Sequence, residues 1–209
     1  IKNLIFLGSS CVYPKFCKQP MKESYLLSGK LEETNDAYAI AKIAGIMMCH
    51  NYSKKYKLNY QSLMPPNLFG PGDNYNLKTS HFFPALLKKI YLAKMNRKKS
   101  IKVWGTGKPR RELMFVEDFV DALMYFMNKK IKEPFVNIGV GRDFTIDWYA
   151  KYIMKKFRVK LKISYDRKKS DGMPKKCLDI SLAKKYGWKP SNNLDNGFNI
   201  TLRDFLKSK

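Results

Sequence analysis

Two side chains spaced for acid–base chemistry, Tyr38 and Lys42, lie four residues apart in this sequence. The stretch Asn35-Asp36-Ala37-Tyr38-Ala39-Ile40-Ala41-Lys42 is rich in helix formers, and residues i and i+4 share one face of a helix. An isolated phenol releases its proton only well above neutral pH, but a neighbouring cation stabilises the phenolate. The pair therefore suits an acid for carbonyl reduction or a base for alcohol oxidation. Lysine is abundant in this chain, so the spacing needs support from other residues.

Hydroxyl and thiol groups follow an apolar run near the start of the chain. Leu4-Ile5-Phe6-Leu7 is typical of a buried parallel strand, and it ends in Gly8-Ser9-Ser10-Cys11-Val12-Tyr13-Pro14. Ligands of open α/β sheets bind at such carboxyl ends. Ser, Tyr and Lys together can polarise a carbonyl group and protonate its oxygen. Loop caps for Ser9 and Ser10 and a small buried hydrophobe for Cys11 are the structural alternatives, and spacing alone leaves both readings open.

These side chains would be positioned by a strand–loop–helix–strand unit, which predicts a parallel sheet. We expect a loop over 12–30, a helix from a cap at 34–36 to about Lys57, and a strand over 60–64 that stops at Pro65-Pro66-Asn67. Patterns further on predict helices over 82–95, 118–127 and 146–157, strands over 101–104, 113–116, 135–139 and 161–165, and a tail of short helices from Ser181 to Lys209.

Composition excludes several classes of protein. The 44% hydrophobic and 14% aromatic content excludes a disordered chain, and the longest apolar runs are too short to span a bilayer. Four cysteines without CxxC spacing favour free thiols in a reducing cytoplasm. With two histidines, no metal site is predicted.

The formal net charge of +24 has two interpretations. It could mark a polyanion-binding protein. However, 34 of the 41 basic residues are lysines spread along the chain, whereas base readout and bidentate phosphate contacts favour arginine. We favour a lysine-rich solvated surface, without a nucleic-acid or membrane partner, and note that anionic substrates would be attracted.

The sequence contains no glycine-rich dinucleotide fingerprint, neither GxGxxG nor GxxGxxG. The chain also opens on Ile1 without a methionine or a signal peptide. If it handles a dinucleotide, we expect the phosphate-binding half to precede Ile1, and it is open whether the chain acts without that half.

Four segments arrive in the order seen in extended short-chain dehydrogenases/reductases. They are Gly8–Pro14, Tyr38-Ala39-Ile40-Ala41-Lys42-Ile43-Ala44-Gly45, Met64–Pro71 and Val103-Trp104-Gly105-Thr106-Gly107. With Cys11 and His81 added, the set resembles the GDP-L-fucose synthase family. The resemblance implies an α/β fold, with part of a Rossmann-type parallel sheet whose N-terminal βαβ half is missing, and a smaller C-terminal α/β substrate domain. The first unit would comprise 1–72 and about 112–142, and the second 73–111 and 143–209.

The resemblance also implies a function and a role for each matched residue. The function is NADPH-dependent 3,5-epimerisation and 4-reduction of GDP-4-keto-6-deoxy-D-mannose by a cytoplasmic homodimer. Ser9, Tyr38 and Lys42 match the reductase triad, and Cys11 and His81 match the pair that moves protons at C3 and C5. Contacts to NADP(H) fall to Gly8, Ser9, Ser10, Lys42, Pro65, Pro66, Asn67, Leu68 and His81. Contacts to the GDP-sugar fall to Lys89, Trp104, Arg111 and Asp171.

Two rivals stay open at this point. Another nucleotide-sugar epimerase or dehydratase of the same superfamily would tolerate Cys11→Ser and His81→Gln. A non-catalytic polyanion-binding fragment would bind DNA in a salt-dependent way and would not bind NADPH.

Overall fold

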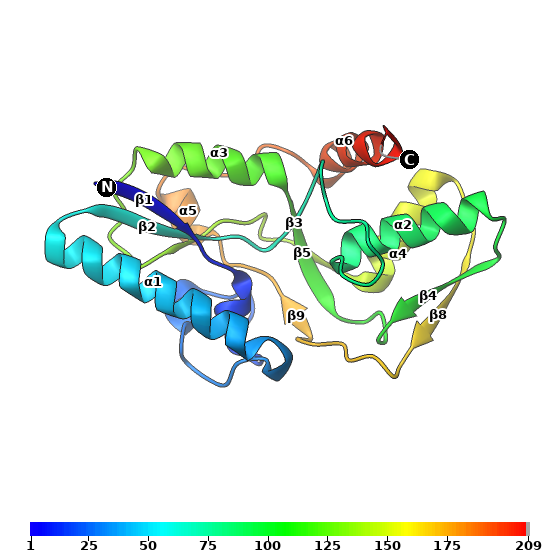
Figure 1. The fold of residues 1–209 in the computed structure, drawn as a ribbon, viewed down its shortest axis with the longest axis horizontal. Coiled ribbons are helices and arrows are strands. Elements are labelled where there is room, and N and C mark those ends of the chain that lie inside the picture. Colours follow the sequence, from blue (N-terminus) through cyan, green and yellow to red (C-terminus); the bar gives the residue numbers. More distant parts are fainter. Residues whose placement is uncertain (208–209) are drawn as a thin grey trace.

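The first β-α-β unit forms as predicted. β1 (Asn3–Leu7) and β2 (Asn59–Met64) pair in parallel, and α1 (Asp36–Tyr56) connects them. The computed structural model describes residues 1–207 and adds β6 (Val136–Asn137) to the other edge of β2. In Figure 1, α1 and α3 (Val116–Met127) lie on opposite sides of β1 and β2. The carboxyl ends of these strands therefore meet at one edge of the sheet.

The connection between β1 and α1 is a loop with three short 3-10 helices. These are η1 (Ser10–Val12), η2 (Glu23–Tyr25) and η3 (Glu33–Asn35). The last of them leads directly into α1, so the helix that carries Tyr38 begins at the rim of the loop.

A second sheet is built around β5 (Arg110–Phe115). It pairs in parallel with β3 (Asn67–Phe69) and β9 (Lys175–Lys176), and antiparallel with β7 (Asp143–Thr145). The sequence predicted only β5 of these four strands, and it placed a turn from Phe69 onward. A strand of two or three residues is too short to show an alternation of apolar and polar residues. Such strands can be recognised only from the strands with which they pair.

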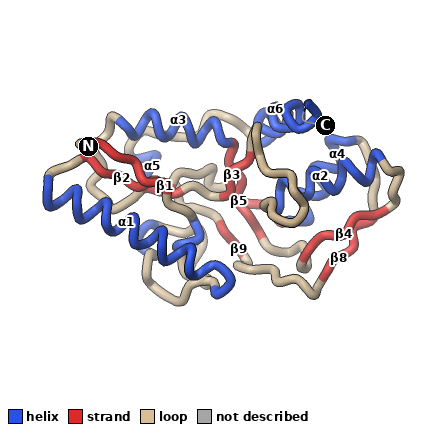
Figure 2. Tube along the Cα trace, in the orientation of Figure 1, coloured by secondary structure: helices blue, strands red, loops and turns tan. Residues whose placement is uncertain are grey.

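At the end of the molecule opposite the N-terminus, helices pack over a two-stranded sheet. β4 (Ser100–Trp104) and β8 (Lys162–Asp166) pair in parallel, and α2 (Phe82–Met95) packs on α4 (Ile146–Phe157). Figure 2 shows these four elements together at the end of the molecule opposite the N-terminus. The prediction of short helices in the tail was partly wrong. α5 (Ser181–Lys185) is short, but α6 (Leu194–Lys207) is a 14-residue amphipathic helix.

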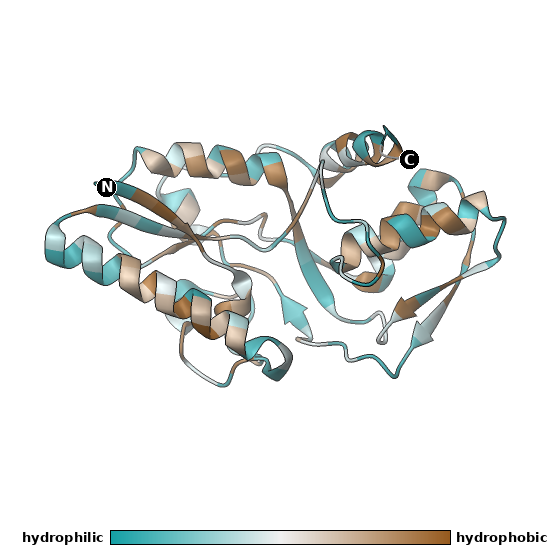
Figure 3. Cartoon of the chain, in the orientation of Figure 1, coloured by the Kyte–Doolittle hydropathy of each residue, from teal (hydrophilic) through white to brown (hydrophobic). Residues whose placement is uncertain are grey.

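Three clusters of buried apolar side chains hold these elements together. One joins α2, α4, α6 and the β4–β8 pair, including Phe83, Ile153 and Phe198. The other two lie on the two sides of the β1–β2–β6 sheet. In Figure 3 the hydrophobic colour is strong on β1 and α2, whereas β9 and the start of β5 are hydrophilic. Polar segments thus cross the middle of the molecule.

The division into two units stays a prediction, but the packing suggests a refinement that we propose. Ala183 and Trp188 belong to the same buried cluster as Leu63 of β2, and Leu178 and Ile180 share a cluster with Val12. We therefore propose that residues 177–190 belong with the first unit. Among residues 1–207, no helix has the length and apolar character needed to cross a membrane.

Candidate functional site

A cavity of about 590 Å³ opens at the carboxyl ends of β1 and β2. It lies where an open parallel sheet binds its ligands. Of the residues predicted to contact NADP(H), all except Lys42 line this cavity. Those that line the cavity are Gly8, Ser9, Ser10, Pro65, Pro66, Asn67, Leu68 and His81, together with Cys11 and Tyr38.

Close main-chain approaches shape the floor of this cavity. The N–H of Gly8 donates to Leu63 O at 2.9 Å, and the N–H of Ser10 donates to Pro65 O at 3.1 Å. A Cβ atom at Gly8 would overlap the end of the Met64 side chain and lie 3.3 Å from Leu63 O, so a larger residue there would require Met64 to move. Ser9 caps the short helix η1, since its Oγ accepts from Cys11 N at 3.2 Å. This cap does not exclude the predicted role, because the residue also faces the cavity.

Tyr38 and Lys42 share one face of α1, as their spacing predicts. The Nζ of Lys42 lies 5.6 Å from the centre of the Tyr38 ring and donates to Leu7 O at 2.9 Å. Tyr38 is 46% exposed and borders the cavity. Lys42 is thus anchored to the end of β1, and its charge lies beside the phenol ring.

The Cys11 thiol has a cationic partner that the sequence analysis did not identify. Burial by itself would raise the pKa of Cys11. The Lys176 ammonium, 3.2 Å from Sγ, and hydrogen bonds with Ser9 and Asn35 outweigh burial and hold this pKa below its usual value. A thiol with a lowered pKa is more thiolate at neutral pH and is a better proton acceptor.

A second cavity, of about 320 Å³, lies between α2, β4 and the loop after β8. All four residues assigned to the GDP-sugar line it: Lys89, Trp104, Arg111 and Asp171. Trp104 is 52% exposed rather than part of the core, and the Nζ atoms of Lys89 and Lys169 lie 5.2 Å and 5.3 Å from its ring centre. An aromatic face beside two ammonium groups suits an anionic ligand that carries a ring.

Arg111 and Asp171 are held by contacts distant in sequence. Arg111 donates through Nη1 to Met173 O at 2.6 Å and through Nη2 to Asp171 O at 3.1 Å. The Asp171 carboxylate accepts from the N–H and the hydroxyl of Thr106, both at 2.7 Å. Asp171 therefore fixes the Gly105–Gly107 turn, which is a larger role than a local turn within its own loop.

His81 lines both cavities. It is the N-cap residue of α2 and its side chain makes no capping hydrogen bond, so the ring is not committed to the helix end. A ligand in either cavity would meet this imidazole. Both members of the predicted proton-transfer pair, Cys11 and His81, line the first cavity, and only His81 also lines the second.

Lys176, Asn35 and Lys169 are the polar neighbours that sequence reasoning missed as site residues. Asn35 could have been found, because it stands at the start of the helix that carries Tyr38. Lys176 is 165 residues from Cys11 and is one of 34 lysines, so no local pattern marks it. Its position depends on how β9 packs beside β5.

The chain matches known proteins along its length. Residues 1–139 match the family described as the NAD dependent epimerase/dehydratase family. GDP-L-fucose synthase of Escherichia coli (strain K12) is 41% identical, over all of this chain and 68% of its own length. Probable GDP-L-fucose synthase 1 of Oryza sativa subsp. japonica is also 41% identical, over all of this chain and 63% of its own length. The chain therefore spans about two thirds of the length of these relatives.

Solved structures show the same architecture. A GDP-L-fucose synthetase from Naegleria fowleri bound to NADP superposes with a TM-score of 0.89 at 28% identity, covering 100% of this chain and 67% of that one. A GDP-6-OMe-4-keto-L-xylo-heptose reductase from C. jejuni has a TM-score of 0.91 at 28% identity, covering 100% of this chain and 71% of its own. The fold is thus shared with these proteins.

Proposed function

The chain belongs to the NAD dependent epimerase/dehydratase family, and from this membership we propose that its protein converts GDP-4-keto-6-deoxy-D-mannose into GDP-L-fucose with NADPH. The observation that carries the proposal is the arrangement of the two cavities. Apart from Lys42, the residues matched to the cofactor line one cavity, those matched to the GDP-sugar line the other, and His81 lines both. The NADP-bound Naegleria fowleri relative supports NADP(H) as the cofactor.

The residues fit this cofactor at its reactive end. The first cavity opens at a strand end, it is bordered by Tyr38, and Gly8 lets the main chain approach closely. Ser9, Ser10 and the 65–68 loop would line the cofactor, with Lys42 beside it. When bound, NADPH would supply a hydride.

Epimerisation would use Cys11 and His81, which both line the first cavity. The hydrogens beside the C4 ketone are acidic because their removal gives an enolate. In the proposed reaction, Cys11 and His81 remove and return protons at C3 and C5. The cation at Lys176 favours the thiolate of Cys11 for this step. Donors directed at the C4 oxygen would stabilise the enolate.

Reduction would then use Tyr38 and Lys42. Tyr38 is proposed to protonate the C4 oxygen, with Ser9 as a second donor to that oxygen and Lys42 stabilising the phenolate that remains. Lys89 and Arg111 would contact the diphosphate and Trp104 a ring of the ligand.

The test separates the two half-reactions. Purified protein is incubated in D₂O with the 4-keto sugar nucleotide, with or without NADPH, and deuterium at C3 and C5 is measured by NMR. We expect Cys11→Ser and His81→Gln to abolish or strongly reduce deuterium incorporation while NADPH still binds. Deuterium uptake unchanged in both variants would favour the rival 4-epimerase or dehydratase, and DNA binding without NADPH binding would favour the polyanion-binding reading.

We also propose that the protein is a homodimer in a reducing compartment such as the cytoplasm. A stripe of exposed apolar side chains runs along α1, formed by Ile40, Met48, Tyr52 and Tyr56 at spacings of eight, four and four residues. Such a stripe on a single helix is suited to packing against another copy. All four cysteines are free thiols, which supports the compartment. Light scattering on Met48→Lys tests the dimer, because a change in mass to that of a monomer is expected.

A further inference from the structure

A buried carboxylate in β5 holds main-chain groups from two other segments. Glu112 is 0% exposed. Its Oε1 accepts from the N–H groups of Val140 and Gly141 at 2.5 Å and 2.7 Å, and its Oε2 accepts from Leu178 N at 2.7 Å. Charge-assisted bonds from main-chain N–H groups restrain the backbone itself, not only a mobile side chain.

The segment held through Leu178 is the one that carries the partner of Cys11. Leu178 is two residues beyond Lys176, whose Nζ lies 3.2 Å from Cys11 Sγ. In the register of β5 and β9, Lys176 is opposite Arg111, next to Glu112 in sequence. The carboxylate therefore bonds to the same short stretch whose side chain reaches the thiol.

Other bonds also hold this stretch, including the pairing of β9 with β5 and a bond from Asp179 N to Met21 O at 2.9 Å. β9 is two residues long, and the bonds beyond it come from the loop that precedes η2: Met21 N donates to Cys177 O at 2.7 Å, and the Gln19 side chain accepts from Cys177 N at 3.0 Å. The bond from Leu178 N, in contrast, is accepted by a side chain of β5. Glu112 is thus the side chain that ties it to the central strand.

We propose that Glu112 is a positioning residue for the Cys11 thiol, because it fixes the 176–178 segment so that the Lys176 ammonium stays on Sγ. The meaning of this role for epimerisation rests on the function proposed above. Without the Glu112 carboxylate, the N–H of Leu178 would lose its acceptor and the 176–178 segment would shift. The Lys176 ammonium would then move away from the Cys11 thiol.

Burial and hydrogen bonding act in opposite directions on the charge of Glu112, as expected for a buried carboxylate that holds main-chain N–H groups. Burial raises its pKa to about 7, against the three hydrogen bonds from Leu178, Gly141 and Val140. Burying a carboxylate here costs free energy, which the three main-chain hydrogen bonds offset. Replacing Glu112 should therefore alter the positions of the N–H groups that bond to it.

The test uses the pH dependence of Cys11 alkylation by iodoacetamide, followed by mass spectrometry of the peptide that contains Cys11. The charged groups near this thiol are Lys176 and Arg111. Glu112→Gln keeps the shape but presents an amide N–H₂ to N–H donors. We expect its alkylation midpoint to move to higher pH, with a rate at pH 7 lowered about threefold or more.

Two comparisons distinguish positioning from a general loss of stability. The double variant Glu112→Gln/Lys176→Met should shift no further than Lys176→Met alone, since both remove the same interaction. Asp118→Asn changes another buried acid, in α3, and should leave the midpoint unchanged. If Glu112→Gln does not fold, Glu112→Asp keeps the charge with a shorter reach and should shift the midpoint in the same direction.

An alkylation midpoint of the Glu112 variant equal to that of the unaltered protein would overturn the proposal, as would shifts that add in the double variant. The measurement needs neither substrate nor cofactor. A shifted midpoint in a protein that fails the deuterium test would therefore reject the proposed function and retain the positioning role.

Discussion

The chemistry of Cys11 depends on residues that meet only in the folded chain. Its sulfur contacts Lys176, and Ser9 and Asn35 add hydrogen bonds. A thiol with these neighbours differs from the buried hydrophobe that the sequence left open as an alternative. Its reactivity can be measured directly.

Replacing Lys176 with Met removes the cation and keeps most of the side-chain length. Because the ammonium favours the thiolate, the pKa of Cys11 should rise, and alkylation of Cys11 at pH 7 should slow by about threefold to tenfold. The rate is followed from pH 6 to pH 10. Lys175→Met is the matched control, since the neighbouring Lys175 pairs with Asp143 at 3.6 Å. Equal slowing in both variants would show that the effect is not specific to the Lys176 contact.

At the scale of elements, the β-α-β unit and the helices α1 to α4 could be predicted, because their apolar residues repeat over several turns. β3, β7 and β9 could not, since two or three residues define no period. The same limit applies to the site. Local segments such as Ser9–Cys11 and Tyr38–Lys42 were visible, whereas Lys176 reaches Cys11 only through strand pairing with β5.

The close packing of α1 on β1 should govern the position of Tyr38 and Lys42. A Cβ atom at Gly45 would overlap the Phe6 ring, and the Nζ of Lys42 lies 5.2 Å from the centre of that ring. Gly45→Ala should therefore lower the free energy of unfolding by about 1–3 kcal/mol, although alanine is the better helix former. Urea denaturation measures this loss. Adding Phe6→Leu should recover part of it, and a stabilised Gly45→Ala variant would contradict the packing argument.

Asp118 anchors the chain that leads into α6. Its Oδ1 accepts from Ser191 N, Ser191 Oγ, Asn192 N and Asn192 Nδ2, at 2.9–3.0 Å. Asp118→Ala removes the shared acceptor and should lower the free energy of unfolding by about 1–3 kcal/mol, measured in urea. Asp121→Ala, on the exposed side of α3, is the control and should change little. Equal losses for both variants would point to a general effect of removing negative charge.

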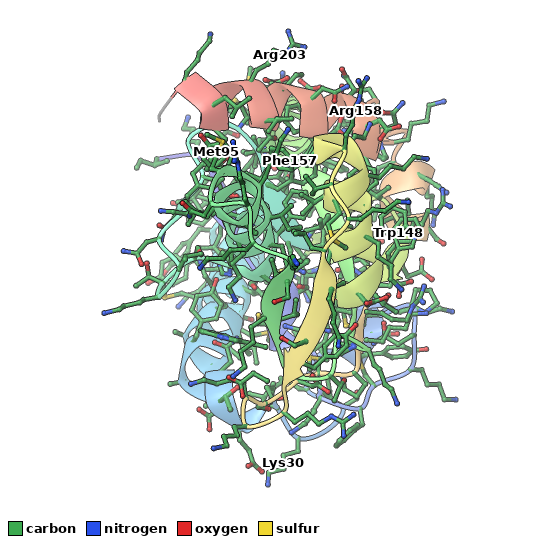
Figure 4. The ribbon with its side chains drawn as sticks, turned by 90° about the vertical axis from the view of Figure 1, so that its right-hand side faces the viewer. Lys30, Met95, Trp148, Phe157, Arg158 and Arg203 are labelled. Carbon is green, nitrogen blue, oxygen red and sulfur yellow. The ribbon has the colours of Figure 1, made fainter. Side chains whose placement is uncertain are left out.

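For the molecule as a whole, the net charge of +24 is spread widely. Among residues 1–207, seven basic side chains form ion pairs with carboxylates, of the 41 in the chain. Figure 4 shows Arg158 and Arg203 near one end of the view and Lys30 at the other. Repulsion between unpaired cations should therefore outweigh the surface ion pairs.

This balance predicts the effect of salt. Raising NaCl from about 10 mM to about 150 mM shortens the Debye length from about 30 Å to about 8 Å and screens the repulsion. The thermal unfolding midpoint should rise by a few degrees. An equal osmolarity of glucose serves as the control. A midpoint that falls with salt would mean that attractive pairs dominate instead.

The shared position of His81 has a consequence for ligand binding. Because its ring lies at the wall of both cavities, a ligand that reorients the imidazole from one side changes what the other ligand meets. Thermodynamic linkage requires such coupling to be reciprocal: if the nucleotide sugar changes the affinity for NADPH by some factor, NADPH changes the affinity for the nucleotide sugar by the same factor. Titration calorimetry in both orders measures that factor, and in His81→Gln it should move towards one.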